Sequence, residues 1–172
     1  MDHLAGSTKN RRAFAYFLGA VIFAKFAVLY LIGPTIWSDT AGYIAFAEAI
    51  LDQGKAFLPV DWIGGPAAPL FVLRMAGYPL VLAGAKLLSV GHYASVTVIF
   101  QIFLNIMSVV LVFKVVSHLA FPVSQIIAIL ALYLFSDSLF LDNSILSDSV
   151  YSSLFNIVVF ALIGRASCRE RV

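Results

Sequence analysis

Carboxylates are the side chains of this chain best placed to do chemistry. Seven of its nine acidic residues lie in two stretches between apolar segments. They are Asp39, Glu48, Asp52, Asp61, Asp137, Asp142 and Asp148. An ionised carboxylate can bind a metal ion or accept a proton from a reacting hydroxyl. The sequence contains no HExxH, Walker A or GxSxG motif, and its one cysteine, Cys168, rules out an internal disulfide and a cysteine-based metal cluster.

Asp39 is the first candidate, because it follows an apolar segment at the predicted start of a helix. Ser38 can cap a helix that runs to about Gln53 and ends at Gly54. Asp39 then lies in the first turn, where the helix dipole favours its charged form, and Tyr43 lies one turn further on the same face. Two interpretations stay open: a catalytic or metal-binding carboxylate, or a residue that only supports the helix start.

Asp148 is the second candidate, in the sequence ILSDSVY at the start of a later apolar segment. If it reaches the same pocket as Asp39, the two carboxylates can share a metal ion or divide acid and base roles. The alternative is that Ser147 or Asp148 only caps a helix. Asp137 and Asp142 are interpreted as solvated loop residues.

Two basic residues have a functional and a structural interpretation. Arg74 and Lys86 could each bind a lipid phosphate or pyrophosphate, Arg74 in a bidentate manner. Each could instead anchor the chain at a membrane surface, and for Lys86 the anchor is favoured. Glu48, Asp52 and Lys55 follow helical spacing and predict a solvated helix face.

The composition predicts the setting of these residues. Of the 172 residues, 62% are hydrophobic and 12% are charged, and the mean hydropathy is +0.98. Soluble domains average about a quarter charged residues. An ordinary soluble enzyme, a nucleic-acid-binding domain and a disordered protein are therefore excluded, and no nucleic-acid partner is expected. The composition favours an all-α, polytopic membrane protein, or part of one.

Hydropathy predicts four membrane spans, because each crossing needs about 20 mainly apolar residues. They cover about 13–34, 94–117, 122–141 and 149–163. The first is interpreted as a signal anchor, because its apolar stretch exceeds the usual core of a cleaved signal peptide and no A-x-A site follows.

The segment 75–90 could either cross the bilayer or lie flat at its surface. If it lies flat, the basic residues of 1–12, 114–121 and 164–172 share one side, and only Lys55, Arg74 and Lys86 lie on the other. That distribution satisfies the positive-inside rule, so the flat arrangement is favoured, with an outer loop at 35–93. The last residues, GRASCRERV, look like a run-off tail on the N-terminal part of a longer protein.

The order of the motifs resembles the GT-C superfamily of membrane glycosyltransferases, in particular its protein O-mannosyltransferase and lipopolysaccharide sugar-transferase branch. The motifs are SDTAGY…ILDQG in the first outer loop, RMAGYPLVLA, which is similar to an RxPGYPL element, and LSDSVYSSLF, which resembles the acidic element of a later span. The resemblance covers residues 1–163. Three departures are Thr40 in place of a second acid, no arginine in 137–147, and no proline before Gly77.

The resemblance implies an enzyme that moves a sugar, with inversion, from a polyprenyl-phosphate donor to a hydroxyl of a glycan, lipid or protein acceptor. It implies a bacterial inner-membrane location with the site facing outward, and two juxtamembrane helices at 39–53 and about 78–90. By this resemblance Asp39 is catalytic, Asp148 is a second acid that could share a divalent metal ion with it, and Arg74 and Tyr78 lie near the donor. The fragment alone is expected to be inactive.

A non-enzymatic membrane protein, such as a transporter or a lipid-flipping subunit, is the alternative. Transporters place polar and charged groups inside their spans, often on broken helices. Here the predicted spans hold few such groups: Lys25, Gln101, Asn105 and Asn156. The collection of acids in the outer loops therefore favours surface chemistry over passage of a solute.

Overall fold

The computed structural model describes residues 2–36, 38–54, 77–117, 122–135, 142–145 and 147–169. Within these ranges, side chains are described from Arg12 to Ile163, apart from those of residues 38, 39, 53 and 133–135. The described elements are helices: α1 (Asp2–Ile32), α2 (Ser38–Gln53), α4 (Gly77–Leu88), α5 (Tyr93–Val116), α6 (Val123–Phe135) and α8 (Ser147–Arg169). The predicted all-α class is therefore confirmed for this part of the chain.

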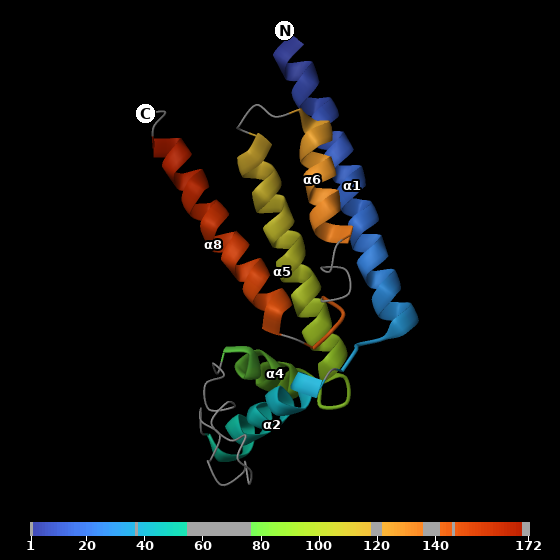
Figure 1. The fold of residues 1–172 in the computed structure, drawn as a ribbon, viewed down its shortest axis with the longest axis vertical. Coiled ribbons are helices and arrows are strands. Elements are labelled where there is room, and N and C mark those ends of the chain that lie inside the picture. Colours follow the sequence, from blue (N-terminus) through green and yellow to red (C-terminus); the bar gives the residue numbers. More distant parts are fainter. Residues whose placement is uncertain are drawn as a thin grey trace.

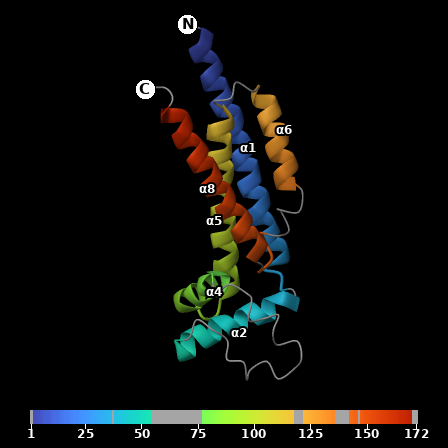
Figure 2. The same ribbon diagram turned by 60° about the vertical axis from the view of Figure 1, so that its left-hand side comes forward.

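Four helices run alongside one another, and two lie across one end of them (Figures 1 and 2). The upright helices are α1, α5, α6 and α8, and the transverse helices are α2 and α4. The start of α1 and the end of α8 lie together at the opposite end from α2 and α4. At 12 residues, α4 is about 18 Å long, which is too short to cross a bilayer core of about 30 Å.

The helix boundaries follow local signals in the sequence. α2 runs from Ser38 to Gln53, as predicted, and Gly54 ends it with a φ of 63° and an N–H donated to the Ile50 carbonyl at 3.0 Å. Gly33 ends α1 in the same left-handed conformation, with a φ of 76°. α1 begins at Asp2, well before the apolar stretch that defined its predicted start.

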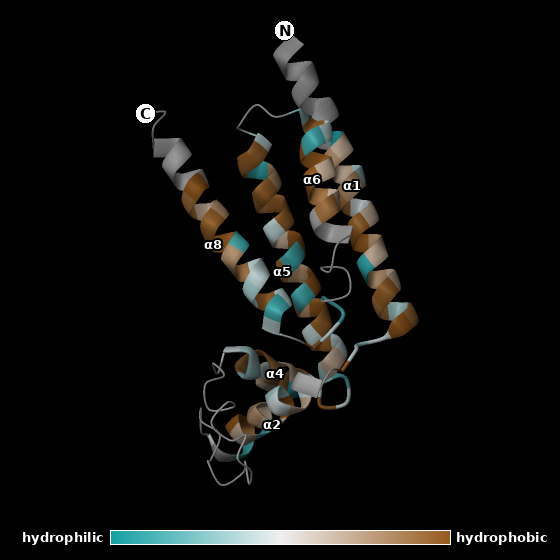
Figure 3. Ribbon diagram, viewed as in Figure 1, coloured by the Kyte–Doolittle hydropathy of each residue, from teal (hydrophilic) through white to brown (hydrophobic). Residues whose placement is uncertain are grey.

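Two helices are long and apolar enough to cross a membrane: α1 over Arg12–Ile32, and α5 over Tyr93–Val116. Gly77–Leu88, Val123–Leu132 and Ser147–Ile163 are shorter apolar helices. Figure 3 shows the hydrophobic residues that dominate α1, α5 and α6, and the hydrophilic positions on α5 and α8. Length and composition thus single out two of the four predicted spans.

Apolar packing joins α1, α5 and α6 along the length of the bundle. Phe14 stacks on Phe113 of α5 with ring centroids 3.6 Å apart and an interplanar angle of 6°. The buried residues of this cluster are Phe14, Val21, Val109, Ile126 and Leu130. These contacts fix α1 against α5 on the side away from α8.

Residues 142–145, which the structure describes between α6 and α8, are not helical, yet they are buried. Asp142, Asn143, Ser144 and Ile145 are each at most 4% exposed. Thr35, which follows α1, forms a parallel β-bridge with Ser144: the Thr35 N–H donates to the Asn143 carbonyl at 2.9 Å, and the Ile145 N–H donates to the Thr35 carbonyl at 3.1 Å. The segment 142–145 is thus held by backbone bonds that a helix would otherwise supply.

Side chains complete the bonding of the segment 142–145. Asn143 Nδ2 donates to the Gly33 carbonyl at 2.6 Å, and Gln101 Nε2 of α5 donates to the Ser144 carbonyl at 3.2 Å. The Lys25 ammonium of α1 forms an ion pair with the Asp142 carboxylate, and both side chains are almost fully buried. The prediction that Asp142 is a solvated loop residue is therefore wrong, because its charge is buried against a cation 117 positions earlier.

Removal of one partner of this ion pair is expected to destabilise the protein by about 3–5 kcal/mol, because the other charge stays buried without compensation. Asp142→Asn and Lys25→Met should each lower the unfolding temperature of the purified protein in detergent. The double variant Lys25→Met/Asp142→Leu, which removes both charges, should recover most of the loss. Glu48→Gln, which breaks a half-exposed ion pair, should have little effect. An Asp142→Asn variant as stable as the wild type would contradict the assignment.

Candidate functional site

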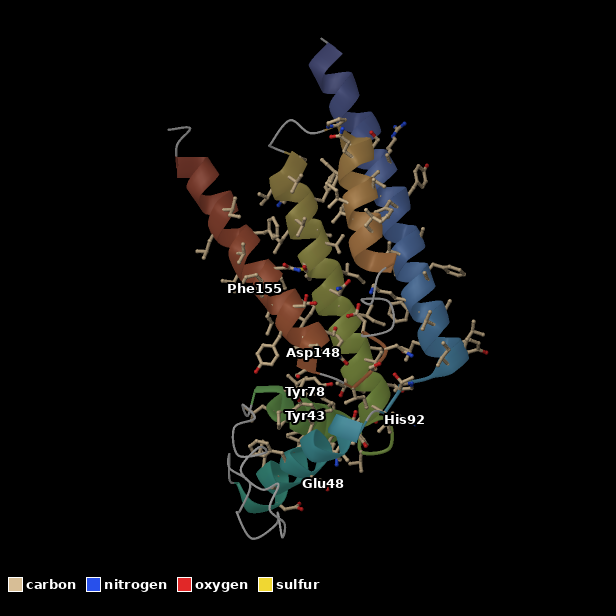
Figure 4. The ribbon with its side chains drawn as sticks, in the orientation of Figure 1. Tyr43, Glu48, Tyr78, His92, Asp148 and Phe155 are labelled. Carbon is tan, nitrogen blue, oxygen red and sulfur yellow. The ribbon has the colours of Figure 1, made fainter. Side chains whose placement is uncertain are left out.

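The candidate site lies where α2 and α4 meet the start of α8. A second apolar cluster forms this junction, with Ala47 from α2, Tyr78 and Leu82 from α4, and Ile145 and Val150 from the α8 side. Tyr43 and Tyr78 contact each other edge to face, with ring centroids 5.1 Å apart. Figure 4 shows both tyrosines close to Asp148 at the start of α8. The junction therefore gathers three elements that are distant in sequence.

Two hydrogen bonds hold the first two turns of α2 against the start of α8 and the residues just before it. Thr40 Oγ1 donates to the Ile145 carbonyl at 3.0 Å, and the Tyr43 hydroxyl and Ser147 Oγ are 2.9 Å apart. Thr40 is the next residue after Asp39, and Ser147 is the residue before Asp148. The two positions predicted to carry catalytic or metal-binding carboxylates thus belong to helix starts that are bonded to each other.

The two carboxylates differ in what the structure describes. Asp148 is solvent-exposed in the first turn of α8. Asp39 lies in the first turn of α2, as predicted, but its side chain is outside the described atoms. A shared pocket for these two acids stays a prediction, and the backbone arrangement is compatible with it.

Tyr78 lies inside the junction instead of lining an open surface. Its side chain is 2% exposed, and its hydroxyl has no hydrogen-bond partner among the described residues. Burial raises the pKa of the Tyr78 phenol above its usual value of about 10, and the nearby Tyr43 raises it further. Tyr78 is therefore neutral at physiological pH, and contact with a sugar donor would need the junction to open.

Lys86 is engaged by protein groups. Its ammonium forms an ion pair with Glu48 of α2 and lies 4.9 Å from the centroid of the Tyr93 ring. Glu48 and Asp52 are both exposed, in agreement with the predicted solvated face of α2. The ion pair links α2 to α4, so binding of a phosphate by Lys86 would compete with Glu48.

Other predicted residues lie outside the described part of the chain, including Arg74 and Asp137. Among the described side chains, no group of three or more His, Cys, Asp or Glu residues is placed to hold a metal ion. Figure 4 shows the phenols of Tyr43 and Tyr78 near Asp148, and phenols are poor ligands for a hard divalent cation. The side chain of Asp39, the other ligand that the resemblance implies, lies outside the described atoms, so the divalent metal ion stays a prediction.

A hollow of about 490 Å³ lies between α4 and α5. It is lined almost wholly by apolar groups, among them Leu80, Leu88, Phe100 and Phe103. Such a surface offers shape and apolar contact but no group that can transfer a proton or hold a charge. Of these two places, the α2–α4–α8 junction is the one with described groups that could take part in chemistry.

The sequence analysis missed the residues that hold the junction in place. Lys25 was noted as a lone charge in an apolar stretch, and Ser149 was not singled out. In the structure Asp142 Oδ2 accepts from Lys25, and Asp142 Oδ1 accepts from Ser149 Oγ. The one available signal was Lys25 itself, since a charge inside a long apolar helix demands a partner.

The two tyrosines of the junction are expected to respond oppositely to loss of their hydroxyls. Tyr43→Phe should destabilise the protein by about 1 kcal/mol, because it removes the bond to Ser147. Tyr78→Phe should be neutral or stabilising, because it removes a buried hydroxyl that has no partner among the described residues.

The alkaline response provides a second measurement of Tyr78. Below about pH 10 the phenol is neutral in both the folded and the unfolded state. Above that pH the unfolded state loses the proton first, because the folded pKa is raised, so stability falls as pH increases. The unfolding temperature of Tyr78→Phe should therefore fall less than that of the wild type above about pH 10. Equal alkaline losses in both proteins would contradict the buried, unpartnered phenol.

The chain was compared with protein-family models, with curated proteins and with solved structures. None of the three comparisons finds a match. The resemblance to the GT-C glycosyltransferases is thus carried by the short motifs quoted above, and it stays a prediction.

Proposed function

We propose that this protein is a multi-pass membrane glycosyltransferase, or part of one, which transfers a sugar from a polyprenyl-phosphate donor to an acceptor hydroxyl at the non-cytoplasmic face. The observation that carries the proposal is the bonding of the first two turns of α2 to the start of α8 and the residues just before it, through Thr40–Ile145 and Tyr43–Ser147. That bonding supports a common location for Asp39 and Asp148, which two-carboxylate chemistry requires.

The distribution of polar groups supports the membrane setting. Lys25, Gln101 and Asn105 are at most 2% exposed, whereas large apolar side chains face outward. Examples of the outward residues are Phe23 at 76%, Tyr30 at 89% and Leu31 at 78% exposed. Soluble monomers rarely expose apolar surface on this scale, while a bilayer provides an apolar solvent for it. We therefore propose that α1, α5, α6 and α8 lie in the bilayer, with α6 too short at 13 residues to cross it alone.

The positions of the charges support the orientation. The start of α1, which carries Lys9, Arg11 and Arg12, and the end of α8, which carries Arg165 and Arg169, lie at one end of the molecule (Figure 1). The opposite end holds α2, α4 and the first turn of α8. By the positive-inside rule the first end is cytoplasmic, and the candidate site faces outward.

In the proposed reaction Asp39 accepts the proton of the acceptor hydroxyl as that oxygen attacks the anomeric carbon of the sugar. The bond between the anomeric carbon and the phosphate oxygen breaks, and polyprenyl phosphate leaves with the electron pair, which inverts the anomeric centre. Arg74, together with Lys86 once it leaves Glu48, stabilises the departing phosphate charge. No step is assigned to a metal ion.

One structural feature favours the alternative of a transporter. The face of α5 that carries Gln101, Asn105 and Ser108 packs against α8, which contributes Ser149 and Ser153, so polar groups line a helix interface. These five side chains are at most 4% exposed. Small and polar residues at buried helix interfaces are typical of helix association in membranes. The transferase therefore stays the better-supported function.

Substitution of the proposed base tests the function directly. Asp39→Asn, in the protein expressed from its complete reading frame, should lower sugar transfer to an acceptor by about 10²–10⁴-fold, the usual effect of losing a general base. The measurement is turnover of radiolabelled polyprenyl-phosphate sugar in membranes matched for protein abundance. Asp52→Asn, on the exposed face of the same helix, is the matched control and should keep wild-type turnover. Near-wild-type transfer by Asp39→Asn would remove Asp39 from the mechanism.

Accessibility from the two sides of the membrane tests the shared location. In a Cys168→Ser background, Asp39→Cys and Asp148→Cys should both react with an impermeant maleimide added from the outside. Lys114→Cys, near the other end of α5, should react only after the membrane is permeabilised. Reaction of positions 39 and 148 from opposite sides would defeat the shared site.

A further inference from the structure

Lys25 and Asp142 form a buried ion pair inside the helix bundle, where no substrate chemistry is expected. Lys25 lies seven residues before the end of α1, which is about 10 Å along the helix axis from Ile32. The side chains of Lys25 and Asp142 are 1% and 2% exposed. Burial of both charges costs desolvation free energy. The role of this ion pair therefore lies in the segments of the chain that it positions.

The carboxylate of Asp142 uses both of its oxygens. Oδ2 accepts from the Lys25 ammonium, and Oδ1 accepts from Ser149 Oγ in the first turn of α8. Ser149 follows Asp148 directly in the sequence. The Asp142 carboxylate therefore connects Lys25 of α1 to the first turn of α8, which carries the exposed candidate acid Asp148.

The same carboxylate begins the segment that reaches α2. From Asp142 the chain passes through Ser144, whose Oγ lies 2.8 Å from Thr35 Oγ1, to Ile145, whose carbonyl accepts from Thr40. Thr35 lies in the connection between α1 and α2, and Thr40 follows Asp39. Each contact between the helix starts therefore lies within a few residues of the ion pair.

We propose that Lys25 and Asp142 are positioning residues, which set the start of α8 against the connection from α1 to α2 and so hold positions 39 and 148 in one arrangement. Charge neutralisation alone would be satisfied by two apolar residues of similar volume, and these would make no directed bond to Ser149. The catalytic consequence of this role rests on the proposed function. The geometric consequence does not, and it can be measured without any activity.

A disulfide between the bridged positions 35 and 144 reports the arrangement. In a Cys168→Ser background, Thr35→Cys with Ser144→Cys places two thiols where two hydroxyl oxygens are 2.8 Å apart. Oxidation of native membranes by copper phenanthroline should form the disulfide rapidly. Adding Asp142→Asn should lower the initial rate by about tenfold, the change that ~1.4 kcal/mol of lost coupling would produce. Adding Glu48→Gln, which breaks the exposed ion pair instead, should leave the rate unchanged.

The double variant Lys25→Met/Asp142→Leu separates positioning from charge burial. It should accumulate in membranes to near the wild-type level, because no buried charge is left alone, and yet form the 35–144 disulfide about as slowly as Asp142→Asn does. If the double variant forms the disulfide at the wild-type rate, the proposal is overturned, and the ion pair only fills space in the bundle. If Asp142→Asn fails to accumulate, the double variant alone decides.

Sugar transfer gives a readout that distinguishes the two proposals. If the wild-type protein transfers sugar, the double variant should show a lower kcat with an unchanged KM for the polyprenyl-phosphate sugar. An unchanged kcat would count against positioning. If the wild-type protein transfers no sugar, the proposed function fails, while the disulfide rates still confirm or overturn the positioning role.

Discussion

The structure depends on one constraint: the non-helical segment 142–145 lies inside a bundle of helices, and its buried backbone groups and carboxylate need partners there. α6 has 13 residues and extends about 20 Å, so it ends before the level at which α8 begins. The segment 142–145 lies between the level where α6 ends and the level where α8 begins. In an apolar solvent such backbone is tolerated only when protein groups satisfy it, and here the connection from α1 to α2, together with α5 and Lys25, supplies those groups.

This constraint explains why polar residues are inside and apolar residues outside. Gln101 is buried because its amide donates to the Ser144 carbonyl. Lys25 is buried because it pairs with the buried Asp142 carboxylate. The same face of α5 continues as Asn105 and Ser108 against α8. α5 is also the helix that α1, α4, α6 and α8 all contact, so its polar face and its apolar faces together define the bundle. Side chains that face outward, by contrast, need no polar partner, and these positions hold many Phe, Leu and Tyr residues.

Features set by neighbouring residues could be predicted from the sequence, and features set by distant partners could not. Ser38 and Gly54 delimit α2 locally, and the run of apolar residues after Tyr93 delimits α5, so both helices agree with prediction. The transverse position of α4 was favoured by the distribution of charges and by the family resemblance, not by the pattern of the helix itself. Asp142 was misread as solvated because the cation that buries it lies 117 positions away. Likewise, nothing local shows that Tyr78 packs beneath α8.

The environments of the ionisable groups at the junction narrow the choice of a proton acceptor. The Tyr78 phenol is a poor base, because burial raises its pKa and keeps it protonated. Asp142 has both oxygens engaged by Lys25 and Ser149, so accepting a proton would break the ion pair on which the segment depends. The Glu48 carboxylate is engaged by the Lys86 ammonium. Among the acidic residues on the helix starts, Asp148 is exposed, and Asp39 belongs to the turn that Thr40 fastens to Ile145. A base placed there can work at the surface without disturbing the buried charges that hold its helix in position.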